Sequence, residues 1–231
     1  MELEILFQDE HLVAINKPHG LLVHRSKIAM DADEFAIQIL RDQIGKTVYP
    51  VHRLDRKTSG ILVFALSPEI NSLMQQQFME RKVDKKYIAL VRGFIDSKGT
   101  IDYPLRKEDG VEQDAVTHFK SLMQGELPFP SGKFETSRYS LVELTPETGR
   151  MHQLRKHMAH VFHPIIGDRP HGCNKQNKLF LERLNMNTML LHALELSFLH
   201  PVTNVRIEIK APLFSEFKRV LELEELSLTA V

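Results

Sequence analysis

The chain has 231 residues, and its 30 lysines and arginines balance 30 aspartates and glutamates. This balance excludes a strongly basic nucleic-acid tail and an acidic solvating chain, and a hydrophobic content of 42% is typical of a globular domain. A single cysteine, Cys173, excludes an internal disulfide and a cysteine-based zinc cage. The longest apolar run is residues 61–66, so we expect no signal peptide or membrane span and a soluble, cytoplasmic protein.

Runs rich in β-branched and aromatic residues predict seven strands, at residues 12–16, 48–53, 61–66, 87–91, 139–144, 190–198 and 205–209. Helical patterns predict four helices, at residues 33–44, 67–78, 150–160 and 213–223. The glycines and prolines of residues 124–133 predict an exposed loop. Adjacent strands with helices at irregular intervals favour an α+β fold over a regular βαβ winding. We expect a single domain over residues 1–231, with two lobes as the alternative.

The neutral total hides a segregation of charge along the chain. Three blocks are net positive, residues 17–27 by +3, 51–92 by +4 and 150–183 by +5, and they contain eight of the twelve histidines. Charge runs are often only solvated faces. These blocks also contain the unusual motifs described next, which favours a local basic surface on a neutral body.

The familiar cofactor and hydrolase motifs are absent from the sequence. No G-x-G, Walker loop, C-x-x-C, H-E-x-x-H or G-x-S-x-G occurs. Nucleotide-cofactor chemistry therefore has no support.

The most informative segment is residues 52–60, His-Arg-Leu-Asp-Arg-Lys-Thr-Ser-Gly, which precedes the apolar run 61–65. Gly60 permits a sharp entry into a strand, so we expect Asp55 on a loop beside a rigid element. Three cations flank Asp55, namely Arg53, Arg56 and Lys57. Nearby cations favour an ionised carboxylate. Asp55 is thus a candidate catalytic group, and a salt bridge within the loop is the alternative.

A second segment, residues 148–157, reads Thr-Gly-Arg-Met-His-Gln-Leu-Arg-Lys-His. On a helix, one apolar stripe contains Met151, Leu154, Met158 and Phe162. Arg155 falls within this stripe, where it needs an anion or bears a heavy desolvation cost. Asp55 is the expected partner, and an arginine that extends to the rim of the stripe is the alternative.

Two further features have more than one interpretation. The histidines at positions 152, 157, 160, 163 and 171 match no standard zinc spacing, so we expect no metal and assign them to RNA contact, helix capping or packing. Tyr87 lies between lysines in the run Lys-Lys-Tyr-Ile-Ala-Leu-Val-Arg-Gly of residues 85–93. A tyrosine there stacks on a base while the lysines meet phosphates, or it packs in the core.

Together these segments resemble the RluA-type family of pseudouridine synthases. The blocks in the family's order are residues 17–24, 52–65, 86–93, 115–117, 148–157, 164–168, 191–193 and 200–201. The Asp55 block matches the family's catalytic motif without a mismatch, and the resemblance covers about residues 5–210. Two positions depart from the pattern, namely His171, where many relatives have tyrosine, and Thr188, where a basic residue is common. They bear on substrate contacts rather than on the reaction.

The resemblance implies an α+β fold with a mixed, mostly antiparallel sheet, flanking helices and a central RNA-binding cleft. It also implies that no separate N-terminal RNA-binding domain precedes residue 17. The implied reaction is the isomerisation of a uridine within RNA to pseudouridine, by a monomer that needs no cofactor or metal.

The resemblance also implies roles for individual residues. Asp55 is similar to the essential carboxylate, which attacks the sugar or the base or generates a glycal intermediate. Arg155 would hold Asp55 ionised and oriented, Tyr87 would stack on the target base and assist proton transfer, and Leu154 would line the uracil pocket. Arg53 resembles the residue that enters the RNA stack and holds the flipped state.

The remaining expected RNA contacts follow from the same motifs and from the basic blocks. They are Lys17, His24, Arg25, His52, Arg56, Lys57, Lys86, Arg92, Arg150 and His152. Residues 3–6, residues 41–45 and the acidic insert before Ala115 are similar to those of family members that modify tRNA, which implies a uridine at position 65 as the target. The alternatives are the same chemistry on ribosomal RNA, and an RNA-binding or chaperone role independent of catalysis.

Overall fold

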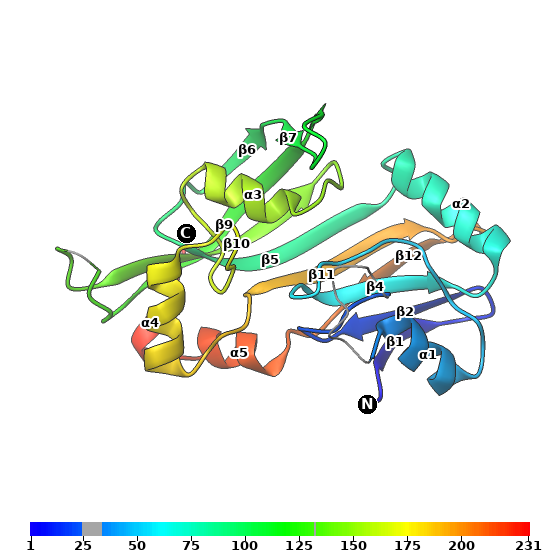
Figure 1. Cartoon of the computed structure of the whole chain (residues 1–231), viewed down its shortest axis with the longest axis horizontal. Coiled ribbons are helices and arrows are strands. Elements are labelled where there is room, and N and C mark those ends of the chain that lie inside the picture. Colours follow the sequence, from blue (N-terminus) through cyan, green and yellow to red (C-terminus); the bar gives the residue numbers. More distant parts are fainter. Residues whose placement is uncertain (25–33, 132) are drawn as a thin grey trace. The chain divides into compact units, whose positions relative to one another are not determined.

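The structure is a computed structural model that describes residues 1–24, 34–131 and 133–231 (Figure 1). The chain forms two compact units. Unit 1 comprises Met1–Lys85 and Ala193–Phe214, and unit 2 comprises Lys86–His192 and Ser215–Val231. The boundaries fall within two strands, β5 (Asp84–Arg92) and β11 (Leu191–Leu199), so each strand contributes to both units.

Unit 1 is a sheet with the strand order β1-β2-β4-β11, in which β3 also pairs with β4 and β12 with β11. The strands not yet introduced are β1 (Glu4–Gln8), β2 (Leu12–Lys17), β3 (Tyr49–Pro50), β4 (Ser59–Ala65) and β12 (Arg206–Lys210). The pairs β1–β2, β2–β4, β3–β4 and β11–β12 are antiparallel. All seven residues of β4 are buried, so the motif that contains Asp55 leads into the interior of the unit.

Two helices belong to unit 1, α1 (Ala36–Ile44) and α2 (Pro68–Met79). The Ser67 side chain accepts a hydrogen bond from the Ile70 backbone at the start of α2, where Pro68 occupies the first turn. Met74 of α2 packs into a cluster that contains Val63 and Phe198. This packing fixes one face of the β4 strand.

Unit 2 contains the order β5-β10-β9-β13, with β6 paired to β9 and a separate β7-β8 ribbon. Its further strands are β6 (Lys98–Asp102), β7 (Leu105–Arg106), β8 (Glu112–Gln113), β9 (Val116–Leu127), β10 (Ser137–Pro146) and β13 (Thr229–Ala230). Its helices are α3 (Gln153–His160), α4 (Asn174–Leu184), α5 (Ser215–Leu221) and the short 3-10 helix Glu224–Leu226.

The two faces of the unit 2 sheet carry different helices. Ala89 and Val91 of β5 share a buried cluster with Leu154 of α3. Because side chains alternate along a strand, Arg92 points to the other face, where its partner Tyr139 on β10 packs against α4. Figure 1 shows α3 and α4 on opposite sides of β5 and β10. The α3 face and the α4 face are therefore separate surfaces.

The predicted α+β class is confirmed, and most predicted elements exist within a few residues of their expected bounds. The strand predicted at residues 48–53 is present but too long, because only Tyr49–Pro50 pairs with β4 before the chain turns toward Asp55. The loop predicted at 124–133 begins too early, because β9 continues to Leu127, and neither β9 nor α4 was predicted. The first helix begins at Ala36, and the predicted start at Asp33 lies outside the described residues.

Two of the four residues of the predicted apolar stripe on α3 are buried, and two are not. Leu154 and Met158 are buried, whereas Met151 and Phe162 are exposed. The helix begins after Met151 and ends at His160, and Phe162 has a positive φ, so neither residue continues the helical face.

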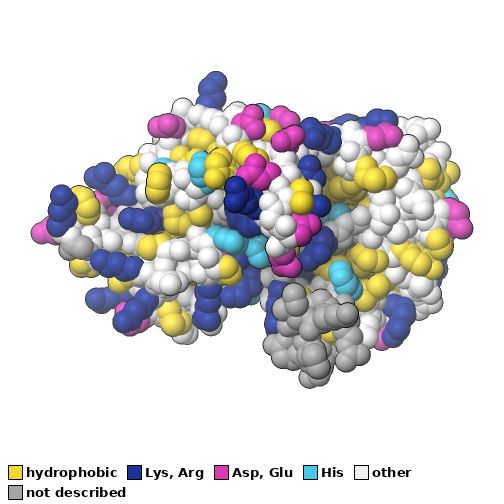
Figure 2. Space-filling view, turned by 45° about the horizontal axis from the view of Figure 1, so that its top comes forward, with side chains coloured by type: hydrophobic (Ala, Val, Ile, Leu, Met, Phe, Trp, Pro, Cys, Tyr) yellow, Lys and Arg dark blue, Asp and Glu magenta, His cyan; other side chains and the backbone are white. Residues whose placement is uncertain are grey.

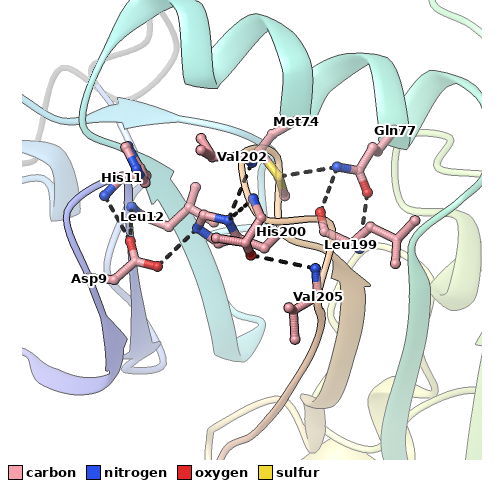
Figure 3. A network of polar contacts seen from close by, with 10 residues as sticks. Asp9, His11, Leu12, Met74, Gln77, Leu199, His200, Val202 and Val205 are labelled. Carbon is pink, nitrogen blue, oxygen red and sulfur yellow. Dashed lines mark hydrogen bonds and ion pairs between the residues drawn. The ribbon is translucent and has the colours of Figure 1, made fainter.

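A buried histidine joins two turns of unit 1 (Figure 3). His200 Nδ1 accepts hydrogen bonds from the backbone of Val202 and Thr203 at 3.3 and 3.1 Å. Its Nε2 lies 3.0 Å from a carboxylate oxygen of Asp9, whose other oxygen accepts from the His11 and Leu12 backbone. Since Nδ1 accepts, the proton of the neutral ring is on Nε2 and faces Asp9. His200 thus joins the β1–β2 turn to the β11–β12 turn.

We expect His200→Ala to lower the free energy of unfolding by about 2–4 kcal/mol, because it removes a buried side chain and leaves two partly buried backbone donors and a carboxylate without their partner. Urea denaturation followed by circular dichroism measures this change. Lys46→Ala, at an exposed position, is the control and should change the free energy by less than about 0.5 kcal/mol. Equal stability of the two variants would contradict the role given to His200.

Candidate active site

Asp55 lies in the loop that leads from β3 into β4. The Thr58 backbone donates to the Asp55 carbonyl at 3.0 Å, which closes a turn around the carboxylate, and Leu54 and Thr58 are buried. Gly60 follows with a φ of 103°, and a Cβ atom there would lie 2.3 Å from the Ala193 carbonyl oxygen. Only glycine satisfies both constraints, so the start of β4 is fixed by backbone contact.

Lys17 ties the Asp55 loop to the segment after β2. Its ammonium group donates to the carbonyl oxygens of Pro18, Leu21 and Arg56 at 3.0, 2.9 and 3.2 Å, and the side chain is fully buried. This differs from the phosphate contact expected from the sequence, because a buried amine that donates to three carbonyls is not available to a backbone phosphate. Burial lowers the pKa of Lys17 to about 7, and the Asp55 carboxylate opposes that shift.

The lowered pKa of Lys17 predicts a specific dependence of stability on pH. Between about pH 7 and 10.5 the unfolded chain keeps a proton that the folded chain has lost, so the free energy of unfolding rises with pH. Compared with Lys17→Met, the wild type should therefore gain up to about 1.4 kcal/mol per pH unit in this window. Urea denaturation of both proteins across the window measures the difference, and parallel curves would contradict the prediction.

The other predicted residues of unit 1 differ in exposure. Arg53 and His24 are exposed, as an RNA contact requires. The Arg56 guanidinium donates to the Gly20 carbonyl at 3.1 Å, which adds a second tie between the loop and the segment after β2. Lys57 is half-buried, and Arg25 lies outside the described residues.

His52 has a packing role in this structure. Its Nε2 accepts from the Val63 backbone at 3.2 Å, and its ring stacks on Phe78 at 5.0 Å. Burial lowers the pKa of His52 to about 4, so the ring is neutral at physiological pH. His52 therefore braces β4 against α2, which differs from the expected charged contact with RNA.

In unit 2, Arg155 forms a buried ion pair with Asp168. Arg155 Nε and Nη2 each donate to one carboxylate oxygen of Asp168 at 2.8 Å. Both side chains are buried, and the bidentate geometry fixes the plane of the guanidinium. The burial of Arg155 was predicted, but Asp168 as its partner was not. The signal was available, since Asp168 is one of only two acids in the basic block 150–183.

The loop that contains Asp168 is tightly constrained. The Asn177 side chain donates to the Asp168 carbonyl at 2.7 Å and accepts from the Gly167 backbone at 2.9 Å. Gly167 has a φ of 81°, and a Cβ there would lie 1.8 Å from the Thr188 carbonyl oxygen. The loop thus holds the Asp168 carboxylate at one position relative to α3.

His152 and His171 form a pair beside this ion pair. His152 Nδ1 lies 3.0 Å from His171 Nε2, so one ring donates to the other and at least one is neutral. Burial is the main cause that lowers the pKa of His171. The departure from the family's tyrosine thus provides a hydrogen-bonding partner for the predicted RNA contact His152.

Leu154 belongs to a buried hydrophobic cluster on the α3 face, and Tyr87 packs against the same cluster. Leu154 precedes Arg155 on α3, so the apolar wall and the guanidinium come from one helical turn. Lys86 lies 3.9 Å from Glu143, at the surface of the unit. Tyr87 is half-buried, and its ring therefore has one side against the cluster.

Gln153 holds the turn before α3 and was missed by the sequence analysis. Its Oε1 accepts from the Thr148 hydroxyl and the Arg150 backbone, and its Nε2 donates to the Val116 carbonyl at 2.9 Å. The Arg150 guanidinium donates to the Asp114 carbonyl at 3.0 Å. His157 contacts the Thr117 hydroxyl and the Tyr103 carbonyl, which makes it a packing residue.

Residues 1–24, 34–131 and 133–231 contain neither a metal-binding group nor a membrane-spanning helix. Within these ranges no three His, Cys, Asp or Glu side chains are grouped as a metal site would require. No helix among them is both long and apolar enough to span a bilayer.

Figure 2 shows basic and acidic side chains interspersed on the face in view, in agreement with the neutral composition.

Comparison with known proteins agrees with these motifs. The sequence model of the family described as RNA pseudouridylate synthase matches residues 11–160. A tRNA pseudouridine synthase C of Vibrio parahaemolyticus is 50% identical, with 91% of this chain and 90% of that protein covered. The protein of the same name from Haemophilus influenzae is 48% identical, with 95% and 96% covered.

Two solved human structures are similar in fold. Human RNA pseudouridylate synthase domain containing 4 has a TM-score of 0.74 at 27% identity, and covers 98% of this chain and 94% of its own. Human RNA pseudouridylate synthase domain containing 1 has the same TM-score at 26% identity, with 91% and 83% covered. The motif that contains Asp55 lies within the matched segment, and the chain belongs to the RNA pseudouridylate synthase family, whose members are isomerases.

Proposed function

We propose that this protein converts one uridine of tRNA to pseudouridine, with Asp55 as the catalytic carboxylate. The observation that carries the proposal is the position of Asp55. Its carbonyl accepts a hydrogen bond from the Thr58 backbone, and the fully buried strand β4 follows in the chain. Relatives near 50% identity that span almost the whole chain are named for a tRNA substrate, which supports tRNA over ribosomal RNA.

The isomerisation breaks the bond between N1 of uracil and C1′ of the ribose and forms a bond between C5 and C1′. The C5 proton is lost and N1 gains one, so atoms balance without a redox step or a cofactor. A carboxylate can start this reaction in three ways: it can attack the ribose, attack the base, or remove a proton from the ribose. Asp55 is assigned to this step.

Arg155 is assigned to the orientation of Asp55. Its Nε and Nη2 edge is engaged by Asp168, and this pairing sets the direction of the Nη1 end of the guanidinium. A guanidinium of fixed orientation holds a carboxylate in one geometry, as near-attack alignment requires. We propose that the Arg155 guanidinium binds the Asp55 carboxylate during the reaction. Tyr87 then stacks on the target base, and Leu154 forms part of the apolar wall around it.

A base inside an RNA stem is inaccessible, so the target uridine has to leave the stack at a cost of a few kcal/mol. Arg53 is exposed in the Asp55 loop, and we propose that it fills the space the uridine leaves. The proposed RNA-contacting residues are His24, Arg56, Lys57, Lys86, Arg150 and His152. We further propose that the target is position 65 and that one cytoplasmic chain acts alone.

The test is the pseudouridine profile of total RNA from cells with and without this protein. Loss of one tRNA pseudouridine in the deletion strain, restored by the purified protein on that tRNA in vitro, is the expected result. Loss of a ribosomal RNA pseudouridine instead would establish the alternative substrate. An unchanged profile, with a deletion phenotype that Asp55→Asn restores, would establish the role independent of catalysis.

A further inference from the structure

Unit 2 contains a cavity of about 200 Å³ that is not lined by Tyr87, Leu154 or Arg155 but is lined by Arg92, one of the RNA contacts expected from the sequence. Its walls come from the end of β5, the start of β10, the connection between β9 and β10, and α4. The lining residues used below are Arg92, Ser131, Phe134, Ser137, Arg138 and Gln176. We call this cavity the Arg92 pocket.

The Arg92 pocket lies on the α4 face of the sheet. Arg92 pairs with Tyr139 across β5 and β10, and the Tyr139 hydroxyl donates to Gln176 of α4 at 2.6 Å. Tyr87 is five residues earlier on β5 and packs on the α3 face with Leu154. At about 3.3 Å per residue the two positions are roughly 17 Å apart along the strand, and they point in opposite directions. A ligand in the pocket is therefore distinct from the target base.

Arg92 is the uncompensated cation of the pocket. Its side chain is exposed, and among the described residues no carboxylate forms an ion pair with its guanidinium. The neighbouring Arg138, in contrast, is neutralised by Glu126, with Nε 2.8 Å from the carboxylate. The planar fork of a guanidinium matches two phosphate oxygens, so an anion of this type is the expected partner of Arg92.

Phe134 provides an exposed aromatic wall. Its side chain is 62% exposed, and Lys133 Nζ lies 5.5 Å from the ring centroid. The pocket is also lined by the hydroxyl groups of Ser137 and Ser131. The Gln176 amide donates to their Oγ atoms at 3.1 and 3.4 Å, respectively. An exposed ring beside cations is the combination with which proteins bind unpaired nucleotides, by stacking on the base and pairing with the phosphate.

We propose that the Arg92 pocket binds one unstacked nucleotide of an RNA chain, with the base on Phe134 and the phosphate on Arg92. This inference rests on the proposed function for the source of the RNA. Because the pocket is on the α4 face, the bound nucleotide belongs to a part of the substrate away from the target uridine. The pocket is then a second contact that selects an RNA with an unpaired nucleotide at the correct distance.

The test is the affinity of the full chain for a five-nucleotide cytidine oligoribonucleotide, which contains no uridine to react. Arg92→Gln should weaken binding about tenfold and reduce the slope of log K against log salt by about 1. Phe134→Ala should also weaken binding about tenfold through lost stacking. Lys107→Gln and Phe162→Ala remove an exposed cation and an exposed ring outside the pocket, and both should bind like the wild type.

Cytidine 5′-monophosphate is the second probe. If it binds as tightly as the oligonucleotide and depends on the same two residues, a free nucleotide is the ligand; if only the oligonucleotide binds, the ligand is a chain. Wild-type affinity of both pocket variants for the oligonucleotide would overturn the proposal. Pseudouridine formation by the wild type is assayed separately, so failure of the pocket and failure of the proposed function give different results.

Discussion

Asp55→Asn is expected to reduce pseudouridine formation in tRNA by at least about 10⁴-fold, the scale of losses seen when an essential catalytic group is removed. The amide has almost the same shape as the carboxylate, but it is neither a nucleophile nor a base. The half-buried position of Asp55 and the backbone bonds around it do not depend on its charge, so the variant should fold. Single-turnover conversion of the tRNA substrate measures the rate.

Two further measurements separate loss of chemistry from loss of structure. Thermal unfolding and tRNA affinity of Asp55→Asn should stay close to the wild-type values. Arg53→Gln serves as the matched variant in the same loop, because it removes a charge that is proposed to act on the RNA stack. It should weaken conversion less than Asp55→Asn does. Product formation by Asp55→Asn at the wild-type rate would refute the catalytic assignment.

Asp168→Asn is expected to destabilise unit 2 by about 3 kcal/mol, since it removes the buried, bidentate counter-charge that Asp168 provides to Arg155. The rate of pseudouridine formation should also fall, by about 100-fold, because the guanidinium loses the bidentate contact that orients it. Denaturant unfolding and single-turnover rates measure the two effects. The affinity for tRNA should change far less than the rate, since Asp168 is buried and has no proposed contact with RNA.

The double variant Asp168→Asn/Arg155→Met tests whether the two residues act as a pair. Removal of the buried guanidinium charge as well should restore part of the stability lost in Asp168→Asn, with a coupling energy of about 1–3 kcal/mol, but it should not restore the rate. Glu112→Gln breaks an exposed ion pair with Arg106 and should cost less than about 1 kcal/mol. Additive effects of Asp168→Asn and Arg155→Met would show that the pair is not coupled.

The sequence predicted the elements with strong local signals. The apolar run of β4 and the Ser67-Pro68 start of α2 are local patterns, and both are present as expected. The strand β9 was missed because its twelve residues include glycine, glutamine and glutamate and are only partly buried. Its pairing with β10 over ten positions stabilises the strand, and such a long-range contact leaves no local pattern.

In the candidate site, too, local patterns were predictable and long-range contacts were not. Asp55 and Arg155 stood out by residue type and spacing, whereas the roles of Tyr87 and Leu154 came from the family resemblance. All four roles stay predictions, and the structure places Tyr87 and Leu154 in one hydrophobic cluster. The partner of Arg155 was not predictable from helical periodicity, because Asp168 is thirteen residues away on a loop. Lys17 was misassigned for a related reason, since a lysine in a basic block gives no sign that its amine ends among carbonyl oxygens.

The contact between Gly60 and the Ala193 carbonyl limits how this protein can diverge. The atom that excludes a side chain at Gly60 is a backbone oxygen, and every residue type at position 193 supplies the same oxygen. No second-site change at position 193 can therefore compensate for a side chain at Gly60. We expect sequences that descend from this one and keep the fold to keep Gly60 as well.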